Sequence, residues 1–431
     1  MTLTVIGAGY VGLVTAAVFA ELGNRVYCVD VVREKIAGLK RGKVPFFEPS
    51  LADYLERNIA EGRLFFTTSY KDSVSKSQAV FICVGTPSKD SGETDLTYLF
   101  SAVEETAKNL SGYTLIIIKS TIPIGFEDDL EEIVKKHAKK KFEFASSPEF
   151  LREGSAIEDT LHPDRIVVGT TSKRAQKILL GLHSAISGER IICDIRSAQL
   201  IKYAANALLA SKVSFANAIA TLCEKMGTDV EKVLAGVGAD KRIGRSFLYP
   251  GVGYGGSCLP KDVLAFITIA DHFDYDFNLL RAVDAINNNQ IERFVAKIQI
   301  ALGNKDNSLK NKKIAVLGLA FKPDTDDMRD APSLKIINHL LTLGAQITAY
   351  DPQAIANAKK VLPKITYAKD AQSAIKGADC LVLATEWREF RELDLAQVKK
   401  LLKNPIIIDG RNALDANKAK QLGFKYYGVG R

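Results

Sequence analysis

A glycine-rich segment that leads into a single cysteine is the most specific chemical feature of this 431-residue chain. It runs from Gly251 to Asp262 and places Cys258 where we expect a helix to begin. A thiolate is a nucleophile, and the amino end of a helix favours this charged form. Asp262, four residues on, would share a helix face with Cys258. A lone cysteine is more often a small buried apolar residue. Here, however, little except close approach of the backbone to a ligand explains so many glycines, so the segment indicates covalent catalysis.

A lysine and an asparagine stand four residues apart in a stretch whose apolar residues recur at helical spacing. They are Lys202 and Asn206, within Ser197–Met226. This spacing places both side chains on one face of a helix. Lys202 could instead be a solvated surface residue, but the surrounding helix face is rich in alanine. We therefore expect Lys202 and Asn206 to belong to a site.

Two acidic residues, Glu149 and Glu153, lie in the segment Ser147–Gly154. Carboxylates in such a segment can act as general bases. They could equally form the first turn of a helix, where the helix dipole favours negative charge. The residues alone leave both interpretations open. None of the five histidines stands at metal-ligand spacing, so we predict no metal.

The amino-terminal residues carry a dinucleotide-binding pattern. Gly7, Gly9 and Gly12 form a GxGxxG after a predicted strand, and Asp30 follows at about the 20-residue offset of the ribose-binding acid. Gly7 permits the tight turn, Gly9 admits the pyrophosphate, and Gly12 lets the helix pack on the strand. The Asp30 carboxylate would repel a 2′-phosphate, which favours NAD over NADP, although Lys35 nearby weakens that inference.

Short apolar runs alternate with helical or polar stretches in the first half of the chain, and the alternation restarts near residue 313. This pattern predicts an α/β fold with two Rossmann-like, doubly wound parallel sheets. The second sheet has Gly318–Lys322 in place of the dinucleotide loop, so we expect it to hold a different ligand. The predicted strands are Leu3–Ile6, Arg25–Val29, Ala79–Val84, Thr114–Ile118, Phe142–Ala145, Ile166–Val168, Lys313–Leu317, Gln346–Ala349, Cys380–Ala384 and Ile406–Ile408.

A long helix is predicted between the two sheets. Ser197–Met226 would extend on the order of 45 Å, with Gly227 as its stop. Helices of this length usually bridge domains or form a subunit interface, and we expect a homodimer. A second helix, Asn278–Leu302, ends at Gly303, and a polar linker reaches Asn311. We therefore divide the chain into residues 1–196, a central helical domain at 197–303, and a second α/β domain at 304–431.

Composition excludes several classes of protein. The six cysteines are scattered without a CxxC pair, which favours a reducing compartment. Met1 is followed almost at once by a strand, which leaves no room for a signal peptide, and no apolar run approaches the roughly 18 residues of a membrane helix. The net charge is +8, and the densest basic runs, Lys135–Lys141 and Lys399–Lys403, sit near the ends of predicted helices without interleaved aromatic residues. We expect a soluble cytoplasmic protein that binds neither nucleic acid nor membrane.

Taken together, these motifs resemble those of the UDP-glucose/GDP-mannose dehydrogenase family over essentially the whole chain. Minor departures are Asp324 and Asp330, where many relatives have Asn and Glu. The motifs that carry the resemblance are Gly7–Gly12 with Tyr10, Val84–Pro87, Lys119–Thr121, Ser147–Gly154, Lys202–Asn206, the Cys258 loop, Phe321–Lys322 with Asp326, Asp327 and Arg329, and Asp409–Asn412.

The resemblance implies oxidation of the C6 alcohol of a sugar nucleotide to the acid with two NAD, through a thiohemiacetal and then a thioester on Cys258. It places Lys202 and Asn206 at the reacting oxygen, with Asp262 pairing with Lys202 or ordering a water. Glu153 and Thr121 are the candidate base and water-positioning pair, and Glu149 is a second acid. The NAD contacts it implies are Gly7, Gly9, Tyr10, Val11, Gly12, Asp30, Lys35, Thr86, Thr121, Glu153, Lys261 and Arg329.

The same resemblance favours UDP-glucose as the substrate, because Phe150–Gly154 and His162–Gly169 are similar to the branch of the family that uses it. The alternatives are GDP-mannose and UDP-N-acetylmannosamine. Arg242 is expected to reach the substrate of a neighbouring subunit. The expected substrate contacts are Glu149, Phe150, Leu151, Arg152, Lys202, Asn206, Arg242, Phe247, Tyr249, Gly253, Cys258, Phe321, Lys322 and Arg411.

Two other classes share some of these features. A two-electron hydroxyacid dehydrogenase would have the glycine loop and a lysine–asparagine pair, but it has no use for Cys258 or for a second α/β domain. A regulator that binds nucleotide sugars without catalysis would not retain every expected catalytic residue type. We therefore rank both below a four-electron dehydrogenase.

Overall fold

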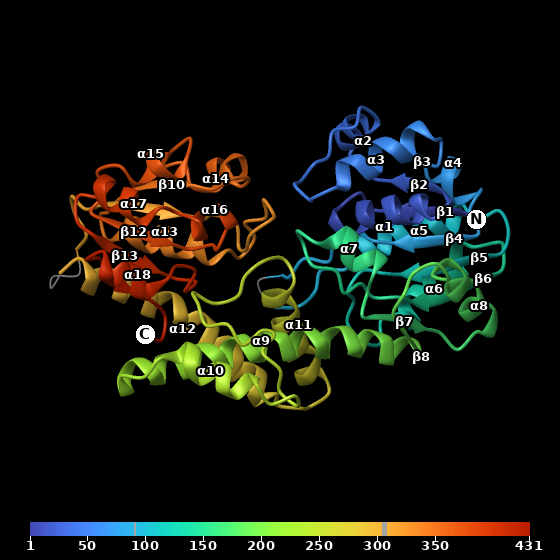
Figure 1. Cartoon of the computed structure of the whole chain (residues 1–431). Helices are drawn as coiled ribbons and strands as arrows, with labels where there is room; N and C mark the ends of the chain where they lie inside the picture. The colour runs from blue at the N-terminus through green and yellow to red at the C-terminus, as the bar shows by residue number, and fades with distance from the viewer. Residues whose placement is uncertain (90–91, 304–307) are drawn as a thin grey trace. The chain divides into compact units, whose positions relative to one another are not determined.

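The computed structural model describes residues 1–89, 92–303 and 308–431. These form two compact units, Met1–Ala205 and Asn206–Arg431. Each unit contains one sheet with its own helices and apolar cores (Figure 1).

The first unit is built on a sheet with eight strands among the described residues, in the order β3-β2-β1-β4-β5-β6-β7-β8. Strands β3 to β6 in this order are parallel, whereas β7 runs antiparallel to β6 and parallel to β8. The strands are β1 Thr2–Ile6, β2 Arg25–Val29, β3 Leu64–Thr67, β4 Ala79–Ile82, β5 Thr114–Ile118, β6 Phe142–Ser146, β7 Arg165–Gly169 and β8 Glu189–Cys193.

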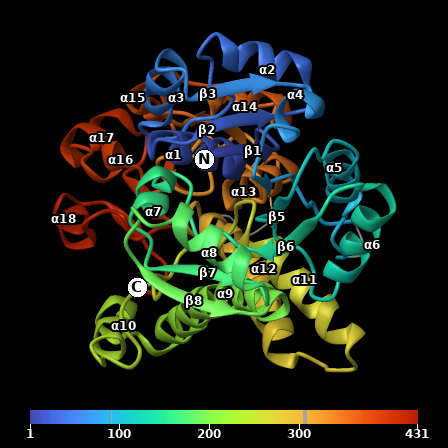
Figure 2. The same ribbon diagram turned by 90° about the vertical axis from the view of Figure 1, so that its right-hand side faces the viewer.

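Helices cover both faces of this sheet because successive strand residues point to opposite sides (Figure 2). Leu3, Val5 and Phe81 pack with helices α1, α2, α3, α7 and α8, while Ile6 and Ile82 pack with α4, α5 and α6. The helices are α1 Tyr10–Glu21, α2 Arg33–Lys40, α3 Leu51–Ala60, α4 Tyr70–Val74, α5 Thr97–Lys108, α6 Glu127–His137, α7 Ala156–Leu161 and α8 Lys173–Leu182.

Helix α9, Ile195–Met226, is a single helix of 32 residues. Gly227 follows it with a φ of +69°, a conformation that glycine adopts without steric cost. The predicted long helix and its stop are therefore confirmed. The division between the two compact units, at Ala205–Asn206, falls within this helix.

The second unit holds a parallel sheet with six strands among the described residues, in the order β11-β10-β9-β12-β13-β14. One face packs with α12, α13 and α14, and the other with α15, α16, α17 and α18. The strands are β9 Lys313–Leu317, β10 Gln346–Tyr350, β11 Thr366–Tyr367, β12 Cys380–Leu383, β13 Ile406–Asp409 and β14 Lys425–Tyr427. The helices are α10 Val230–Gly238, α11 Leu259–His272, α12 Asn278–Ala301, α13 Pro332–Thr342, α14 Ile355–Val361, α15 Ala371–Ile375, α16 Arg388–Arg391, α17 Leu395–Leu401 and α18 Ala416–Gln421.

The α/β class with two doubly wound sheets is confirmed, and each predicted strand lies within two residues of an observed one. The prediction of an all-parallel first sheet is wrong at the β6–β7 pair, where Ser146 faces Gly169 in antiparallel register. Strands β3, β8, β11 and β14 were not predicted. Part of the predicted linker, residues 304–307, lies outside the described residues, and the division into three domains stays a prediction. No described helix is both long and apolar enough to cross a membrane.

Candidate active site

The turn between β1 and α1 has the geometry of a dinucleotide loop. Gly7 has a φ of +98°, and a Cβ on Gly12 would lie only 1.7 Å from the carbonyl oxygen of Gly7. These two glycines therefore hold the turn tight against the first turn of α1. A Cβ on Gly9 would meet no atom within 4 Å, so this backbone faces open space, as a bound pyrophosphate requires. The residues present thus fit a dinucleotide.

Asp30, which follows β2, lies at the same edge of the sheet. Its carboxylate accepts hydrogen bonds from the backbone N–H of Ala8 at 2.9 Å and of Val32 at 3.0 Å, and it pairs with Lys35 Nζ at 2.7 Å. Burial raises the pKa of Asp30, but the bonds from Lys35, Val32 and Ala8 outweigh that effect and leave the pKa below its ordinary value. The group is therefore an acceptor, as the ribose hydroxyls need.

The loops after the central strands meet beside this turn. Thr86 follows β4 and donates its hydroxyl to the carbonyl of Thr121, which follows β5, at 2.9 Å. Tyr10 stacks on Phe46 with ring centroids 4.5 Å apart, and its hydroxyl accepts from Gly154 N–H at 2.9 Å. The ring of Tyr10 thus fixes the loop after β6 to the start of α1.

That loop is fixed a second time by Glu48, a residue that the sequence reasoning missed. Its carboxylate accepts from the N–H groups of Gly154 at 2.6 Å and Ala156 at 2.7 Å. Glu149 and Glu153 lie in the same loop, and α7 begins only at Ala156. The interpretation of Glu149 and Glu153 as the first turn of a helix is therefore wrong.

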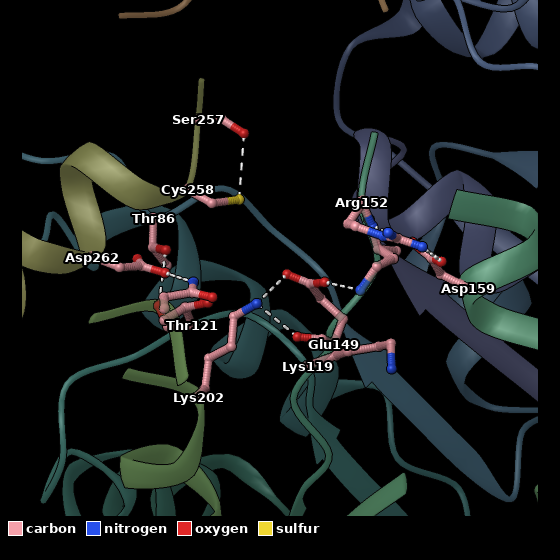
Figure 3. A network of polar contacts seen from close by, with 12 residues as sticks. Thr86, Lys119, Thr121, Glu149, Arg152, Asp159, Lys202, Ser257, Cys258 and Asp262 are labelled. Atoms are coloured by element: carbon pink, nitrogen blue, oxygen red, sulfur yellow. Dashed lines mark hydrogen bonds and ion pairs between the residues drawn. The ribbon is translucent and has the colours of Figure 1, made fainter. Parts of the chain in front are cut away.

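Lys202, on α9, points at the loop after β6 (Figure 3). Its Nζ donates to the carbonyl oxygen of Glu149 at 2.7 Å and to Oε1 of the same residue at 2.9 Å. The second carboxylate oxygen of Glu149 accepts from the N–H of Leu151 at 2.9 Å. Both charged side chains are more than nine-tenths buried, and buried charges of this kind are held by their partners. The interpretation of Lys202 as a solvated residue is wrong.

The next side chains in the loop carry aromatic and basic groups. The ring of Phe150 has the guanidinium of Arg165 over it at 3.9 Å and Lys202 Nζ at 5.4 Å. Leu151 packs against the apolar core beneath α1. Arg152 is exposed and pairs with Asp159 at 2.6 Å. The Nε and Nη2 of Arg152 both donate to the carboxylate of Asp159, so the ion pair is bidentate and holds the guanidinium in place.

In the second unit, Cys258 is the residue that caps the amino end of the 14-residue helix α11. Its thiol lies 3.5 Å from the hydroxyl of Ser257 (Figure 3). Asp262, in the first turn of α11, is fully buried and accepts from Asn206 Nδ2 at 2.6 Å. Lys261 forms an ion pair with the same carboxylate. The prediction that a helix begins at Cys258 is confirmed.

The glycines before Cys258 approach other parts of the second unit closely. A Cβ added at Gly251 would lie 2.9 Å from the carbonyl oxygen of Gly410, and one added at Gly253 would lie 2.8 Å from the side chain of Asn287. A Cβ added at Gly255 would lie 2.3 Å from the carbonyl oxygen of Asp330, and one added at Gly256 would lie 2.6 Å from the ring of Phe321. The expectation that little except a ligand explains these glycines is therefore wrong. They let the loop that carries Cys258 pack against its own unit, which holds the cysteine in place.

Arg411 joins three backbone segments around this loop. It donates to the carbonyls of Ala384 at 2.9 Å, Phe321 at 3.0 Å and Gly253 at 3.3 Å. Lys322 Nζ lies 5.7 Å from the centroid of the Phe321 ring. The structure therefore brings Gly253, Phe321, Lys322 and Arg411 together, all of which were predicted to contact substrate.

The other predicted ligand-binding residues of the second unit include two arginines and two aromatic residues, and the carbonyl of Arg329 accepts from the N–H of Gly256 at 2.9 Å. Arg242 and Arg329 are exposed, and each pairs with an aspartate two residues before it in the sequence. Tyr249 is exposed beneath the guanidinium of Arg245, at 5.4 Å. Phe247 has a φ of +64°, which is strained for an aromatic residue and is most common at functional sites.

Two further observations concern a cavity outside the candidate site and metal binding. A cavity of about 830 Å³ in the first unit is lined by residues such as Lys139, Lys141 and Arg174, and by none of the predicted site residues. Within the described part of the chain, no group of three or more His, Cys, Asp or Glu side chains is arranged to hold a metal ion.

Three features define the class of the protein: a dinucleotide loop on a doubly wound sheet, a buried lysine–glutamate pair, and a second sheet with a cysteine at a helix amino end. It is a two-sheet, NAD-dependent dehydrogenase. Residues 1–187, 196–289 and 315–416 match the NAD binding, central and UDP binding domains of the UDP-glucose/GDP-mannose dehydrogenase family. The chain belongs to this family.

Relatives of known name extend over the whole chain. UDP-glucose 6-dehydrogenase TuaD of Bacillus subtilis is 45% identical over all of this chain and 93% of its own length. The solved structure of a UDP-glucose dehydrogenase from Pyrobaculum islandicum is 37% identical, with a TM-score of 0.92 and coverage of 100% and 97% of the two chains. The UDP-D-ManNAc dehydrogenase of Pyrococcus horikoshii is 28% identical, with a TM-score of 0.87 and coverage of 100% and 99%.

Proposed function

We propose that the chain is a UDP-glucose 6-dehydrogenase that oxidises UDP-glucose to UDP-glucuronate. Two results favour this substrate. The relative at 45% identity bears that name, and identity to solved structures falls from 37% for a UDP-glucose dehydrogenase to 28% for a UDP-D-ManNAc dehydrogenase. The match of residues 315–416 to a UDP binding domain favours uridine over guanosine.

The observation that carries the covalent mechanism is Cys258 at the amino end of α11. Two NAD molecules, bound in turn, would each accept one hydride, and in the first oxidation the C6 hydroxyl also gives up its proton to the proposed base. After the first oxidation, the Cys258 thiolate adds to the aldehyde carbon and the oxygen takes up a proton, which gives a thiohemiacetal. Loss of a hydride and a proton from this adduct leaves a thioester. Water then adds at the thioester carbonyl and breaks the C–S bond, so UDP-glucuronate leaves and the thiol is restored.

The polar residues are assigned around the reacting oxygen. Lys202 and Asn206 stabilise the negative charge that develops on the C6 oxygen, the first as an ammonium and the second as an amide donor. Asp262 fixes the amide of Asn206, and its predicted pairing with Lys202 stays a prediction. Glu153, with Thr121, is the proposed base and water-positioning pair, and Glu149 positions Lys202 through their two hydrogen bonds.

The binding roles follow the two sheets. Residues 1–196 hold NAD through the Gly7–Gly12 loop, Asp30, Lys35 and Thr86, with Lys261 and Arg329 added from the rest of the chain. Residues 304–431 hold the UDP portion through Phe321, Lys322 and Arg411, and residues 197–303 supply Lys202 and Cys258. The exposed position of Arg242 suits a role at the substrate of a second copy.

A homodimer built on α9 is part of this proposal. Large apolar side chains at positions 200, 208, 215, 222 and 226 are exposed along one side of the helix, at intervals mostly of seven or eight residues, and Leu208 is 65% exposed. A continuous apolar stripe of this kind marks a protein interface. Leu208→Asp should give a monomer by light scattering, whereas Lys136→Asp, on the surface helix α6, should not. If the unmodified protein is a monomer in solution, the proposed homodimer is wrong.

The six thiols of the described chain fit a reducing compartment, and we place the enzyme in the cytoplasm. The substrate is tested by incubating the pure protein with NAD and each of UDP-glucose, GDP-mannose and UDP-N-acetylmannosamine. We expect NADH only from UDP-glucose, and a product whose mass exceeds that of UDP-glucose by the exchange of one CH₂ for one C=O. Faster turnover of either other sugar nucleotide would assign the chain to that substrate instead.

A further inference from the structure

The proposed reaction gives no part to Glu48, which lies in the irregular segment between α2 and α3. This residue is buried, with 6% of its surface exposed. Its two carboxylate oxygens have different partners: Oε2 accepts from the N–H of Gly154 at 2.6 Å, and Oε1 accepts from the N–H of Ala156 at 2.7 Å. A buried carboxylate is costly unless hydrogen bonds hold it, so these bonds join Glu48 firmly to the loop after β6.

The two N–H groups belong to the turn that leads from Glu153 into α7. Among the described residues, the side chain of Ser155, which precedes α7, gives the helix no capping hydrogen bond, so the distant carboxylate of Glu48 satisfies donors at the helix start. Gly154 has a φ of +81°, a conformation that favours glycine, and its N–H belongs to the peptide group that it shares with Glu153. Glu48 therefore fixes the peptide group directly after Glu153.

The same segment also contacts the cofactor turn. Phe46, two residues before Glu48, stacks on Tyr10, the first residue of α1, with ring centroids 4.5 Å apart. The hydroxyl of Tyr10 is a second acceptor for the N–H of Gly154, at 2.9 Å. Residues 46–48 thus contact both the start of α1, within the dinucleotide motif, and the backbone that follows Glu153.

We propose that Glu48 is a positioning residue for the oxidation, which holds Glu153 in place relative to the cofactor turn. The inference rests on the proposed function, because Glu153 is the base assigned there. A base acts only within hydrogen-bond reach of the proton that it takes up, and a displacement of about 1 Å can lower a rate by on the order of a hundredfold. Loss of Glu48 should therefore reduce turnover through Glu153, while the NAD contacts of Gly9 and Asp30 remain.

The test compares kcat of Glu48→Gln with that of the unmodified full-length enzyme at saturating NAD and UDP-glucose. Glutamine has nearly the same size, but its amide accepts at one oxygen only and turns a donor NH₂ toward the other N–H group. We expect kcat to fall by about tenfold to a hundredfold, with little change in the KM for NAD. Glu56→Gln, which changes an exposed glutamate of α3, is the matched control and should leave kcat unchanged.

A double variant separates this positioning role from a purely structural one. If Glu48 acts through Glu153, Glu48→Gln should lower kcat no further once Glu153→Gln has removed the base. A role only as a cap of α7 would lower kcat by the same factor with and without the Glu153 carboxylate, and this result would overturn the proposal. An unchanged kcat in Glu48→Gln alone would overturn it as well.

Glu48→Asp serves in the same comparison if Glu48→Gln does not fold. It keeps two acceptor oxygens on a side chain one methylene shorter, which cannot reach both N–H groups, and its effect on kcat should likewise be absent when Glu153→Gln is also present. Failure of Glu153→Gln to lower kcat would refute the assigned base, and the inference with it. Failure of the unmodified enzyme to oxidise UDP-glucose would instead refute the proposed function.

Discussion

Asp30 and Asp351 occupy corresponding places in the two sheets. Asp30 directly follows β2, which pairs with β1, and Asp351 directly follows β10, which pairs with β9. Each carboxylate accepts a backbone hydrogen bond from the loop that follows the neighbouring strand, β1 or β9. Ala8 N–H donates to Asp30 at 2.9 Å, and Leu319 N–H donates to Asp351 at 2.7 Å. Asp351 is fully buried, and the same oxygen also accepts from Trp387 Nε1 at 3.1 Å. Both carboxylates are bonded within the protein, but the loop beside Asp30 has open space at Gly9.

Asp30→Ala should raise the KM for NAD between tenfold and a hundredfold, because it removes the charged acceptor of hydrogen bonds that the ribose hydroxyls donate, each worth about 1.5–3 kcal/mol. The KM for UDP-glucose should not change. Initial rates at a saturating concentration of the other substrate measure both constants. An unchanged KM for NAD would mean that the cofactor is placed wrongly.

Asp351→Ala should act on stability instead of on cofactor binding. It leaves several buried N–H groups without an acceptor, including those of Leu319, Ala320 and Trp387, and each such loss costs about 1–3 kcal/mol. We expect the second unit to unfold at clearly lower urea concentration, with NAD affinity of the first unit retained. A variant with both the stability of the unmodified protein and a lower affinity for NAD would reverse the roles assigned to the two aspartates.

Residues that are close in sequence allowed most of these features to be predicted. The strand–loop–helix order around Gly7–Gly12 and the spacing to Asp30 fixed the cofactor loop, and the glycine stops at Gly227 and Gly303 fixed the ends of α9 and α12. The close contacts of the Cys258 loop could not be predicted, since they join Gly255 to a residue 75 positions away, Asp330.

The missed strands and residues have physical reasons as well. Strand β8 is largely exposed and β11 has only two residues, so neither shows an apolar run. The reversal of β7 depends on pairing with β6, which a sequence pattern does not express. Glu48 is a single carboxylate whose two N–H partners lie more than 100 residues away, and no local signal marks it.

Arg411→Ala should raise the KM for UDP-glucose more than tenfold with little change for NAD, because Arg411 holds Phe321 and Gly253 in one arrangement through charge-assisted hydrogen bonds. Lys322→Ala should act in the same direction. Arg388→Ala, which removes an exposed arginine of the same unit, is the control and should leave both constants unchanged. Equal effects of Arg411→Ala on both substrates would contradict the assignment of the second sheet to UDP-glucose.

His183 should make the stability of the protein fall in mild acid. Burial lowers its pKa from 6.5 to about 4, and the ring stands edge-on to Phe19 while Nδ1 bonds the carbonyl of Leu179. The unfolded chain therefore takes up a proton as the pH falls below 6.5, while the folded one does so only near 4. The contribution of His183 to stability is complete above pH 6.5 and is lost progressively between these values.

Between pH 7.5 and 4.5 this loss amounts to about 2–3 kcal/mol in the free energy of unfolding. Urea unfolding at both pH values should show a smaller difference for His183→Gln than for the unmodified protein. His272→Gln is the control, since His272 is exposed at the end of α11. If His183→Gln keeps the full pH dependence, other groups account for it.

The proposed covalent role of Cys258 predicts both the number of NADH formed per UDP-glucose and the fate of the aldehyde intermediate. The unmodified enzyme should form two NADH for each UDP-glucose, and an aldehyde trap in solution should intercept nothing. Cys258→Ser keeps a nucleophile of similar size, but a hydroxyl ionises far less readily than a thiol, so the ester should form slowly and hydrolyse more slowly still. Intact mass measurement should then detect a protein-bound adduct.

Cys258→Ala cannot form the adduct and should lose the second oxidation, while NAD binding, which depends on the Gly7–Gly12 loop, is retained. Ser257→Ala is the matched control: its hydroxyl lies 3.5 Å from the thiol but takes no covalent part, so two NADH per sugar should still form. Near-normal production of UDP-glucuronate by Cys258→Ala would show that the aldehyde needs no thiol. The chain would then complete the four-electron oxidation without a covalent intermediate on this residue.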